Sequence, residues 1–263
     1  MKSVITTEKM QVRSAFARAA SHYDAVADFQ REAGGYLLAE CELENVPMRI
    51  LDAGCGTGHG LHLIAKRWPQ AQTIALDFAA PMLRRLHGLP ALAVCGDIEA
   101  LPLARASVDL VWSSLAIQWC DTPRVVNEFR RVLCQDGYLA ATTLGPGTFA
   151  ELRHAFMGVD EFRHTNDFID EAQLRLALGS GGFEVVTLRR MELTRYYPDL
   201  RALLASVRDL GANHVAASNR RSGLMGKTAW HRFADNYERM RTASGLPLSY
   251  DTYFILARRM DNS

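Results

Sequence analysis

The most informative segment of this sequence is Leu51-Asp52-Ala53-Gly54-Cys55-Gly56-Thr57-Gly58-His59-Gly60. It follows the short apolar run 48–52, which predicts a buried strand, and it opens the stretch 59–68, which predicts a helix. Glycine lets a backbone adopt positive φ and approach a ligand without collisions from Cβ atoms. The N–H groups of such a turn, with the N-terminus of the following helix, bind anions such as a carboxylate. The segment therefore predicts a strand–turn–helix unit with a small-molecule site at the turn.

This turn does not fit a dinucleotide. The dinucleotide pattern is G-x-G-x-x-G, but its third glycine is replaced by His59 when the pattern starts at Gly54, and by Leu61 when it starts at Gly56. The pattern present here is the acidic residue Asp52 followed by glycines at alternate positions. A ligand other than NAD is expected.

Strands and helices alternate beyond the turn. Further strands are predicted over residues 73–77, 91–95, 108–113, 137–143, 183–193 and 250–258. Helices are predicted over residues 80–87, 123–133, 149–156, 171–178, 199–210 and 227–240. The alternation in the first half indicates βαβ units, and hence a doubly wound α/β fold with a parallel sheet covered on both faces. Ligands of such sheets bind beyond the carboxyl ends of the strands.

The 263 residues are expected to form one domain with additions at both ends. Residues 1–45 are predicted to form a helical arm, with one helix over 8–20 and a second helical stretch through Cys41. The other expected parts are a ligand-binding core over 46–145, a helical lid with a late strand over 146–248, and a closing strand within 249–263.

Composition limits the classes of partner. Thirty lysines and arginines against 29 aspartates and glutamates leave a net charge of +1, so we expect no nucleic-acid or membrane partner. The N-terminus lacks an apolar targeting region, and the uncharged run 110–120 is too short to span a bilayer. The five cysteines show no metal-ligand spacing and indicate a reducing compartment. We therefore expect a cytoplasmic protein without a metal site.

Acidic residues follow three of the predicted strands. Asp52 and Asp77 end the first two strands, and Asp97 follows the third within Gly96-Asp97-Ile98-Glu99. Because the carboxyl ends of parallel strands share one edge of the sheet, the three carboxylates are expected to line one cleft. A carboxylate at the position of Asp77 can accept hydrogen bonds from both hydroxyls of a ribose.

This order of motifs resembles the class I S-adenosylmethionine-dependent methyltransferases. The resemblance implies a Rossmann-like sheet of seven strands with the last one antiparallel, and S-adenosyl-L-methionine as the cofactor. It implies that Asp52 lies near the methionine ammonium, and that Asp97 lies near the adenine amino group. The residues that it implies for cofactor binding are Tyr23, Asp52, Gly54, Gly56, Gly58, Asp77, Phe78, Asp97, Ile98 and Ser113.

Further stretches narrow the resemblance to the malonyl-[acyl-carrier protein] O-methyltransferase family of biotin synthesis, and they span nearly the whole chain. They include residues 16–24 (FARAASHYD), 96–103 (GDIEALPL), 114–120 (SLAIQWC), 206–212 (SVRDLGA) and 247–250 (PLSY). The resemblance implies that Tyr23 forms a lid over the cofactor, and that Gln118 and Trp119 form a wall on the acceptor side. One departure is Ser114, where the family more often has asparagine.

The resemblance also implies the acceptor, which is the free carboxylate of a malonyl thioester on acyl-carrier protein. A carboxylate, with a pKa of about 4, is already ionised at pH 7, so its methylation needs no general base. No histidine or other candidate base stands out, and we assign no catalytic base.

Basic residues concentrate between positions 189 and 232. This segment has nine basic residues and only three acidic ones. The basic residues are Arg189, Arg190, Arg195, Arg201, Arg208, Arg220, Arg221, Lys227 and Arg232. Such a zone suits the steering of an acidic carrier protein and its phosphopantetheine, although a solvated helix surface gives the same pattern. Arg208 is our candidate for holding the malonyl carboxylate through two parallel hydrogen bonds.

Three other functions stay open on the sequence alone. A carboxyl methyltransferase for a free small acid would share the cofactor motifs but would not need the basic zone. A methyltransferase-like regulatory protein is disfavoured because Asp52, Asp77 and Asp97 are all intact. An RNA methyltransferase would be expected to show greater basicity or an added RNA module.

Overall fold

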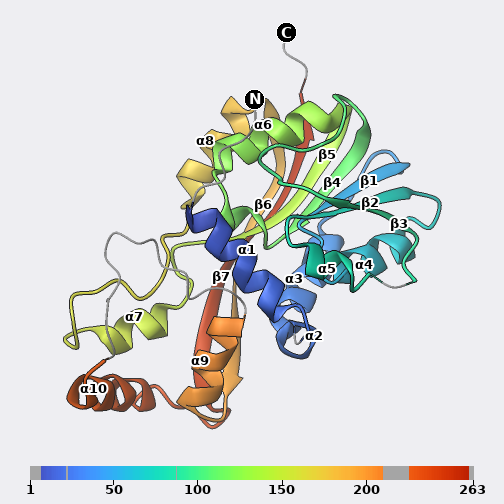
Figure 1. The fold of residues 1–263 in the computed structure, drawn as a ribbon. Helices are drawn as coiled ribbons and strands as arrows, with labels where there is room; N and C mark the ends of the chain where they lie inside the picture. Colours follow the sequence, from blue (N-terminus) through green and yellow to red (C-terminus); the bar gives the residue numbers. More distant parts are fainter. Residues whose placement is uncertain (1–6, 22, 87, 210–224, 261–263) are drawn as a thin grey trace.

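The computed structural model describes residues 7–21, 23–86, 88–209 and 225–260 (Figure 1). A sheet of seven strands forms its centre, in the order β3-β2-β1-β4-β5-β7-β6. The strands are β1 (Arg49–Ala53), β2 (Gln72–Asp77), β3 (Ala91–Cys95), β4 (Val108–Ser114), β5 (Leu133–Leu144), β6 (Phe183–Tyr197) and β7 (Leu246–Arg259). The helices are α1 (Thr7–Ala19), α2 (Tyr23–Val26), α3 (Asp28–Ala39), α4 (His59–Arg67), α5 (Ala80–Leu83), α6 (Thr122–Val132), α7 (Ala150–Phe156), α8 (Glu171–Ser180), α9 (Leu200–Asp209) and α10 (Lys227–Glu238), with the 3-10 turn η1 (Ile117–Trp119).

The direction of the strands confirms the predicted fold class. Neighbouring strands from β3 to β5 are parallel, whereas β7 is antiparallel to both β5 and β6. The strand order reverses between β1 and β4. In open α/β sheets the crevice at such a reversal is where ligands bind.

Alternate residues of the central strands pack on opposite faces of the sheet. Ile50, Leu110 and Trp112 belong to one core cluster, which contains buried residues of α3 and α4. Leu51 and Val111 belong to a second cluster, which contains buried residues of α6 and α8. Successive side chains of a strand point to opposite faces, so these continuous apolar strands are covered on both sides.

Two of the predicted helices are shorter than expected. The helix predicted over 80–87 ends at Leu83, because the chain turns towards β3 through Gly88, whose φ is +76°. The second helical stretch of the arm is divided into α2 and α3, with Ala27 between them outside helical geometry at ψ 25°.

The last two strands are longer than predicted. The strand expected over 183–193 continues to Tyr197, and the closing strand begins at Leu246 rather than at residue 250. Leu144 at the end of β5 pairs with Thr252, so the part of β7 before Thr252 pairs with β6 alone. The outer parts of these two strands therefore form an antiparallel pair that projects beyond the carboxyl edge of the parallel sheet (Figure 1).

Helices α7, α9 and α10 surround this projecting pair of strands (Figure 1). Leu203, Phe233 and Leu248, from α9, α10 and β7, are fully buried in the same core cluster. None of the described helices is long and apolar enough to cross a membrane. In the same part of the chain, no group of three or more His, Cys, Asp or Glu residues could hold a metal ion.

Candidate active site

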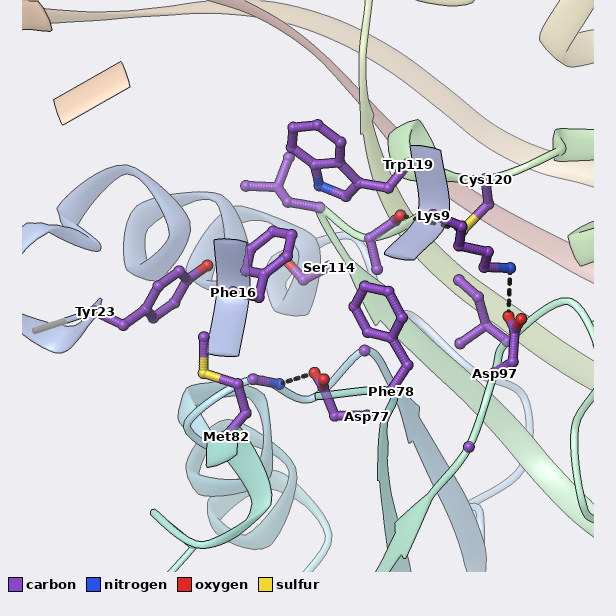
Figure 2. A pocket seen from close by; sticks show the side chains of 16 residues that line it. Lys9, Phe16, Tyr23, Asp77, Phe78, Met82, Asp97, Ser114, Trp119 and Cys120 are labelled. Atoms are coloured by element: carbon purple, nitrogen blue, oxygen red, sulfur yellow. Dashed lines mark hydrogen bonds and ion pairs between the residues drawn. The ribbon is translucent and has the colours of Figure 1, made fainter. Parts of the chain in front are cut away.

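Helix α1 crosses the carboxyl ends of the central strands, and a cavity lies beneath it (Figure 2). This first cavity is lined by Lys9, Phe16, Tyr23, Gly54, Gly56, Asp77, Phe78, Met82, Gly96, Asp97, Ile98, Ser114, Leu115, Ala116, Trp119 and Cys120. A second cavity shares Tyr23, Gly54, Gly56 and Ser114 with the first and continues towards α3 and α4. The first cavity thus joins the expected carboxylates Asp77 and Asp97, while Asp52 lines the second.

The glycine turn has two kinds of glycine. Gly56 has φ +53° and borders both cavities, and a Cβ placed on it would meet no protein atom closer than Tyr23 Cε1 at 3.9 Å. Gly58 has φ +96°, but its Cβ would lie 2.7 Å from Leu86 and 2.8 Å from Leu89. Gly56 therefore leaves room for a ligand, whereas Gly58 lets the turn pack against a neighbouring loop and does not line either cavity.

Asp52 is buried at the end of β1, and its Oδ2 has no hydrogen-bond partner among the described residues. Burial, followed by the nearby charge of Asp77, raises the pKa of Asp52 to about 8. A Cβ on Gly60 would lie 2.7 Å from Asp52 Oδ2 and 2.9 Å from Trp112 Nε1, so both polar atoms face this glycine. A buried carboxylate without a partner is costly, and a cationic group of a ligand would relieve that cost.

Four buried polar atoms that have no hydrogen-bond partner among the described residues belong to side chains lining the second cavity. They are Gln30 Oε1, Asp52 Oδ2, His59 Nε2 and Trp112 Nε1. The first two are acceptors, the indole N–H is a donor, and the imidazole serves as either. This mixture fits a ligand end that carries both an ammonium and a carboxylate, as the methionine part of the cofactor does.

Asp77 ties the end of β2 to the glycine turn. Its Oδ2 accepts the N–H of Gly56 at 3.0 Å, and its Oδ1 accepts the N–H of Ala79 at 2.8 Å. Burial raises the pKa of Asp77, against the opposing effect of these backbone hydrogen bonds. Since a carboxylate has about four acceptor positions, Asp77 keeps capacity for ligand hydroxyls within the first cavity.

Asp97 is held from above by Lys9 of α1 (Figure 2). Lys9 Nζ lies 2.6 Å from Asp97 Oδ1 and 2.9 Å from Glu99 Oε1. Although burial acts to lower the pKa of Lys9, hydrogen bonds to Asp97 and Glu99 raise it overall, so the ammonium stays charged. The sequence prediction did not find Lys9, because its partners lie about ninety positions away in the chain and no local pattern marks the pair.

Aromatic rings from three segments close the first cavity (Figure 2). The ring of Phe16 lies 6.3 Å from that of Tyr23, 6.3 Å from that of Phe78 and 5.7 Å from that of Trp119, centroid to centroid. Burial, with the charges of Asp77 and Asp24, raises the pKa of Tyr23. Its phenol therefore stays protonated at neutral pH and does not act as a base.

Besides Gly58, three predicted site residues lie outside the two cavities. Ser113 is fully buried and donates its hydroxyl to the carbonyl of Ala53 at 2.8 Å, while the next residue, Ser114, lines both cavities. Ser114, and not Ser113, therefore faces the cavities, because neighbouring side chains of a strand point opposite ways. Gln118 donates its Nε2 to the carbonyl of Leu115 at 2.7 Å and lines a separate surface hollow with α8.

Arg208 is the third predicted site residue outside the cavities. It lies exposed on α9 and does not line the first or second cavity. Three of the nine basic residues in the zone pair with acidic residues outside it. Arg189 pairs with Glu40, Arg190 with Asp251 and Arg195 with Glu32. Arg220 and Arg221 lie outside the described residues. The surplus of positive charge counted in the sequence is therefore larger than the surplus that these arginines present.

Several known proteins that are similar to this chain are named methyltransferases. A methyltransferase-domain family model matches residues 51–141. The malonyl-[acyl-carrier protein] O-methyltransferase of Laribacter hongkongensis is 43% identical, with 97% of this chain and 90% of the relative covered. That of Dechloromonas aromatica is 40% identical, with 95% of each covered. The biotin biosynthesis bifunctional protein BioHC of Cellvibrio japonicus is 38% identical over 95% of this chain and 50% of its own length.

Solved structures share the fold at low sequence identity. The YcgJ protein of Bacillus subtilis has a TM-score of 0.59 at 15% identity, covering 88% of this chain and 99% of that one. A geranyl diphosphate methyltransferase in complex with SAM has a TM-score of 0.53 at 15% identity, covering 88% and 85%. At this identity the likeness establishes the class I methyltransferase fold and nothing about the acceptor.

Proposed function

The chain belongs to the malonyl-[acyl-carrier protein] O-methyltransferase family, and we propose that the two joined cavities beneath α1 are where it binds its cofactor for that reaction. It is an S-adenosylmethionine-dependent carboxyl methyltransferase of biotin synthesis, and acyl-carrier protein carries its substrate. When bound, the cofactor supplies an electrophilic methyl group on a sulfonium. The chain itself has to orient that group, exclude water and admit the malonyl carboxylate.

One observation carries the placement of the cofactor. Asp52, Asp77 and Asp97 stand in order at the ends of β1, β2 and β3, and they line two cavities that share Gly54 and Gly56 of the glycine turn. Oδ2 of Asp52 faces the methionine ammonium in this proposal, with Gly56 leaving space for the chain of the amino acid and Gly54 allowing close packing against Ala116. Asp77 accepts hydrogen bonds from the ribose hydroxyls, and Asp97 meets the adenine, beside Phe78 and Ile98.

Tyr23 and Trp119 are the aromatic residues that we expect to cover the cofactor and to face the acceptor. Tyr23 borders both cavities, so its ring covers the junction where the sulfonium would lie. Trp119 lies across the first cavity from Tyr23, with Phe16 between them (Figure 2), and forms the wall towards the acceptor. A dry, aromatic junction suits a displacement in which charge is neutralised as the carboxylate meets the sulfonium.

The acceptor requires no base from this chain. A malonyl carboxylate is ionised at pH 7. Burial raises the pKa of Tyr23 and of the Cys120 thiol, so neither group is poised to remove a proton at neutral pH. Arg208, predicted from the sequence to hold the malonyl carboxylate, lies on α9 outside the cofactor cavities, so the role that we propose for it is to guide the malonyl-phosphopantetheine of the carrier protein. Gln118, given its hydrogen bond to Leu115, supports the wall and does not contact the acceptor.

Initial rates with a panel of acceptors test this function. The panel holds malonyl-acyl-carrier protein, malonyl-coenzyme A, acetyl-acyl-carrier protein and a free tricarboxylate, with S-adenosylhomocysteine formation as the readout. We expect turnover with both malonyl thioesters, fastest on the carrier protein, and none with the acetyl thioester. Preferred turnover of the free tricarboxylate would assign the enzyme to small-acid methylation instead.

A further inference from the structure

Lys9 is the one cation that lines the first cavity within the described chain. It belongs to α1, whereas its partners Asp97 and Glu99 follow β3, 88 and 90 positions away. The three side chains are largely shielded from solvent, with exposed fractions of 11%, 18% and 12%. Shielding from water strengthens an ion pair of good geometry, so this contact is stronger than an exposed one.

The two carboxylate oxygens of Asp97 differ in the hydrogen bonds that they accept. Oδ1 accepts from Lys9 Nζ at 2.6 Å and from the N–H of Glu99 at 2.9 Å. Oδ2 receives no hydrogen bond from the described residues. With Oδ1 held by two donors, the carboxylate is fixed in rotation, and Oδ2 is its available acceptor. Asp97 and Ile98 both line the cavity, so that acceptor stands beside an apolar wall.

We propose that Lys9 is a positioning residue for the adenine end of the cofactor. Its ammonium holds Asp97 by Oδ1, so that Oδ2 accepts a hydrogen bond from the exocyclic amino group of the purine. The same ion pairs fasten the arm helix α1 over the occupied cavity. This inference rests on the proposed cofactor site and adds to it the residue that sets its selectivity for adenine.

A purely mechanical role for Lys9 has a different consequence. If Lys9 only fastened α1, its loss would weaken the binding of every ligand of the cavity by the same factor. If it orients Asp97, its loss removes the preference for a purine that carries the amino group. Without Lys9, the carboxylates of Asp97 and Glu99 also lose the cation that they share, and their mutual repulsion turns Asp97 away from its position.

The test compares two ligands by calorimetry. One is S-adenosylhomocysteine, and the other is its analogue whose purine lacks the 6-amino group. We expect wild type to prefer the amino-bearing ligand by roughly tenfold to a hundredfold, the range for a hydrogen bond to a charged group. We expect this ratio to approach one in Lys9→Met and in Asp97→Ala, and to be partly restored in Lys9→Arg.

Arg18→Met is the matched control, because Arg18 is an exposed basic residue on the same helix. It is expected to keep the wild-type ratio, and thermal unfolding shows whether each variant is folded. An unchanged ratio in Lys9→Met, with both affinities lowered equally or not at all, would overturn the inference. Wild type that binds neither ligand would refute the cofactor site itself, which is a separate outcome.

Discussion

At the scale of single residues, Gly56 gives the sharpest test of the glycine turn. Its φ of +53° is strained for any residue with a Cβ, by about 1 kcal/mol or more, and a side chain there would enter the space between the cavities. Gly56→Val is expected to fold but to lose cofactor affinity by more than about tenfold. Calorimetry with S-adenosylhomocysteine and a thermal melt measure the two effects.

Gly35→Ala is the control for that variant. Gly35 lies within α3, and a Cβ on it would meet nothing within 4 Å, so the change should leave binding intact and favour the helix slightly. A folded Gly56→Val protein with wild-type affinity would place the cofactor elsewhere.

Asp52 predicts a link between cofactor binding and protons. With its pKa raised to about 8, the carboxyl group is mostly protonated at pH 7, whereas a bound ammonium favours the ionised form. Binding at pH 7 should therefore release a proton, and affinity should rise between about pH 6 and 8 and then level off. Calorimetry in buffers with different ionisation enthalpies counts the protons released. In Asp52→Asn the release should disappear; if it persists there, Asp52 is not its source.

The same scale shows what the sequence could and could not predict about the site. Asp52, Asp77 and Asp97 were found because an acidic residue at the end of a parallel strand has a fixed place in the fold. The sequence did not show that Ser114 rather than Ser113 faces the cavities, because the exact residue at which a strand leaves the sheet is set by its pairing partners. Lys9 was missed because its role depends on a contact between segments far apart in the sequence.

At the scale of elements, α1 acts as the cover of the first cavity. Phe16 is its central contact, since it lies against the rings of Tyr23, Phe78 and Trp119. Phe16→Ala is expected to raise the KM for the cofactor and its dissociation rate by about tenfold, because the aromatic ring that joins the other rings around the cavity is lost. Stopped-flow dissociation of S-adenosylhomocysteine measures this directly.

Met10→Ala controls for the stability of that helix. Met10 also lies on α1, but its side chain is exposed, so its loss should leave the dissociation rate unchanged. Equal dissociation rates in wild type and Phe16→Ala would mean that α1 does not cover the bound cofactor.

The elements also differ in how well the sequence predicted them. Strands β1 to β4 of the parallel core were found close to their observed ends, because each is bounded by glycine or by a polar turn. Strand β5 begins at Leu133, four residues before its predicted start and directly after α6. The lengths of β6 and β7 were underestimated. Their outer halves are stabilised by pairing with each other and by packing against α9, where Leu203 is buried together with Leu248 of β7. Such contacts leave no periodic signal in either strand alone.

At the scale of the whole molecule, the carrier protein has to be brought to the cavity by long-range forces. Arg208 lies exposed on α9, within a zone whose other arginines are partly neutralised. Arg208→Ala is expected to raise the KM for malonyl-acyl-carrier protein several-fold at low salt, with a smaller effect at high salt. With malonyl-coenzyme A, the loss should be slight at saturation if Arg208 acts in docking.

Arg175→Ala supplies the comparison, because Arg175 is an exposed arginine on α8 that pairs with Glu171. It should leave both substrates unaffected. A large, salt-independent loss with both thioesters in Arg208→Ala would move Arg208 from docking to direct contact with the malonyl carboxylate. Unchanged kinetics with both would exclude it from the site.

The identity of the methylated atom tests the central claim most directly. The enzyme is incubated with malonyl-acyl-carrier protein and a cofactor whose methyl group is deuterated. The acyl group is then released, and tandem mass spectrometry locates the label from its fragments. We predict a single labelled methyl ester on the terminal carboxylate of the malonyl group, and no label on the polypeptide of the carrier protein. A label on the carrier polypeptide, or no label on malonyl while the cofactor is consumed, would contradict the account.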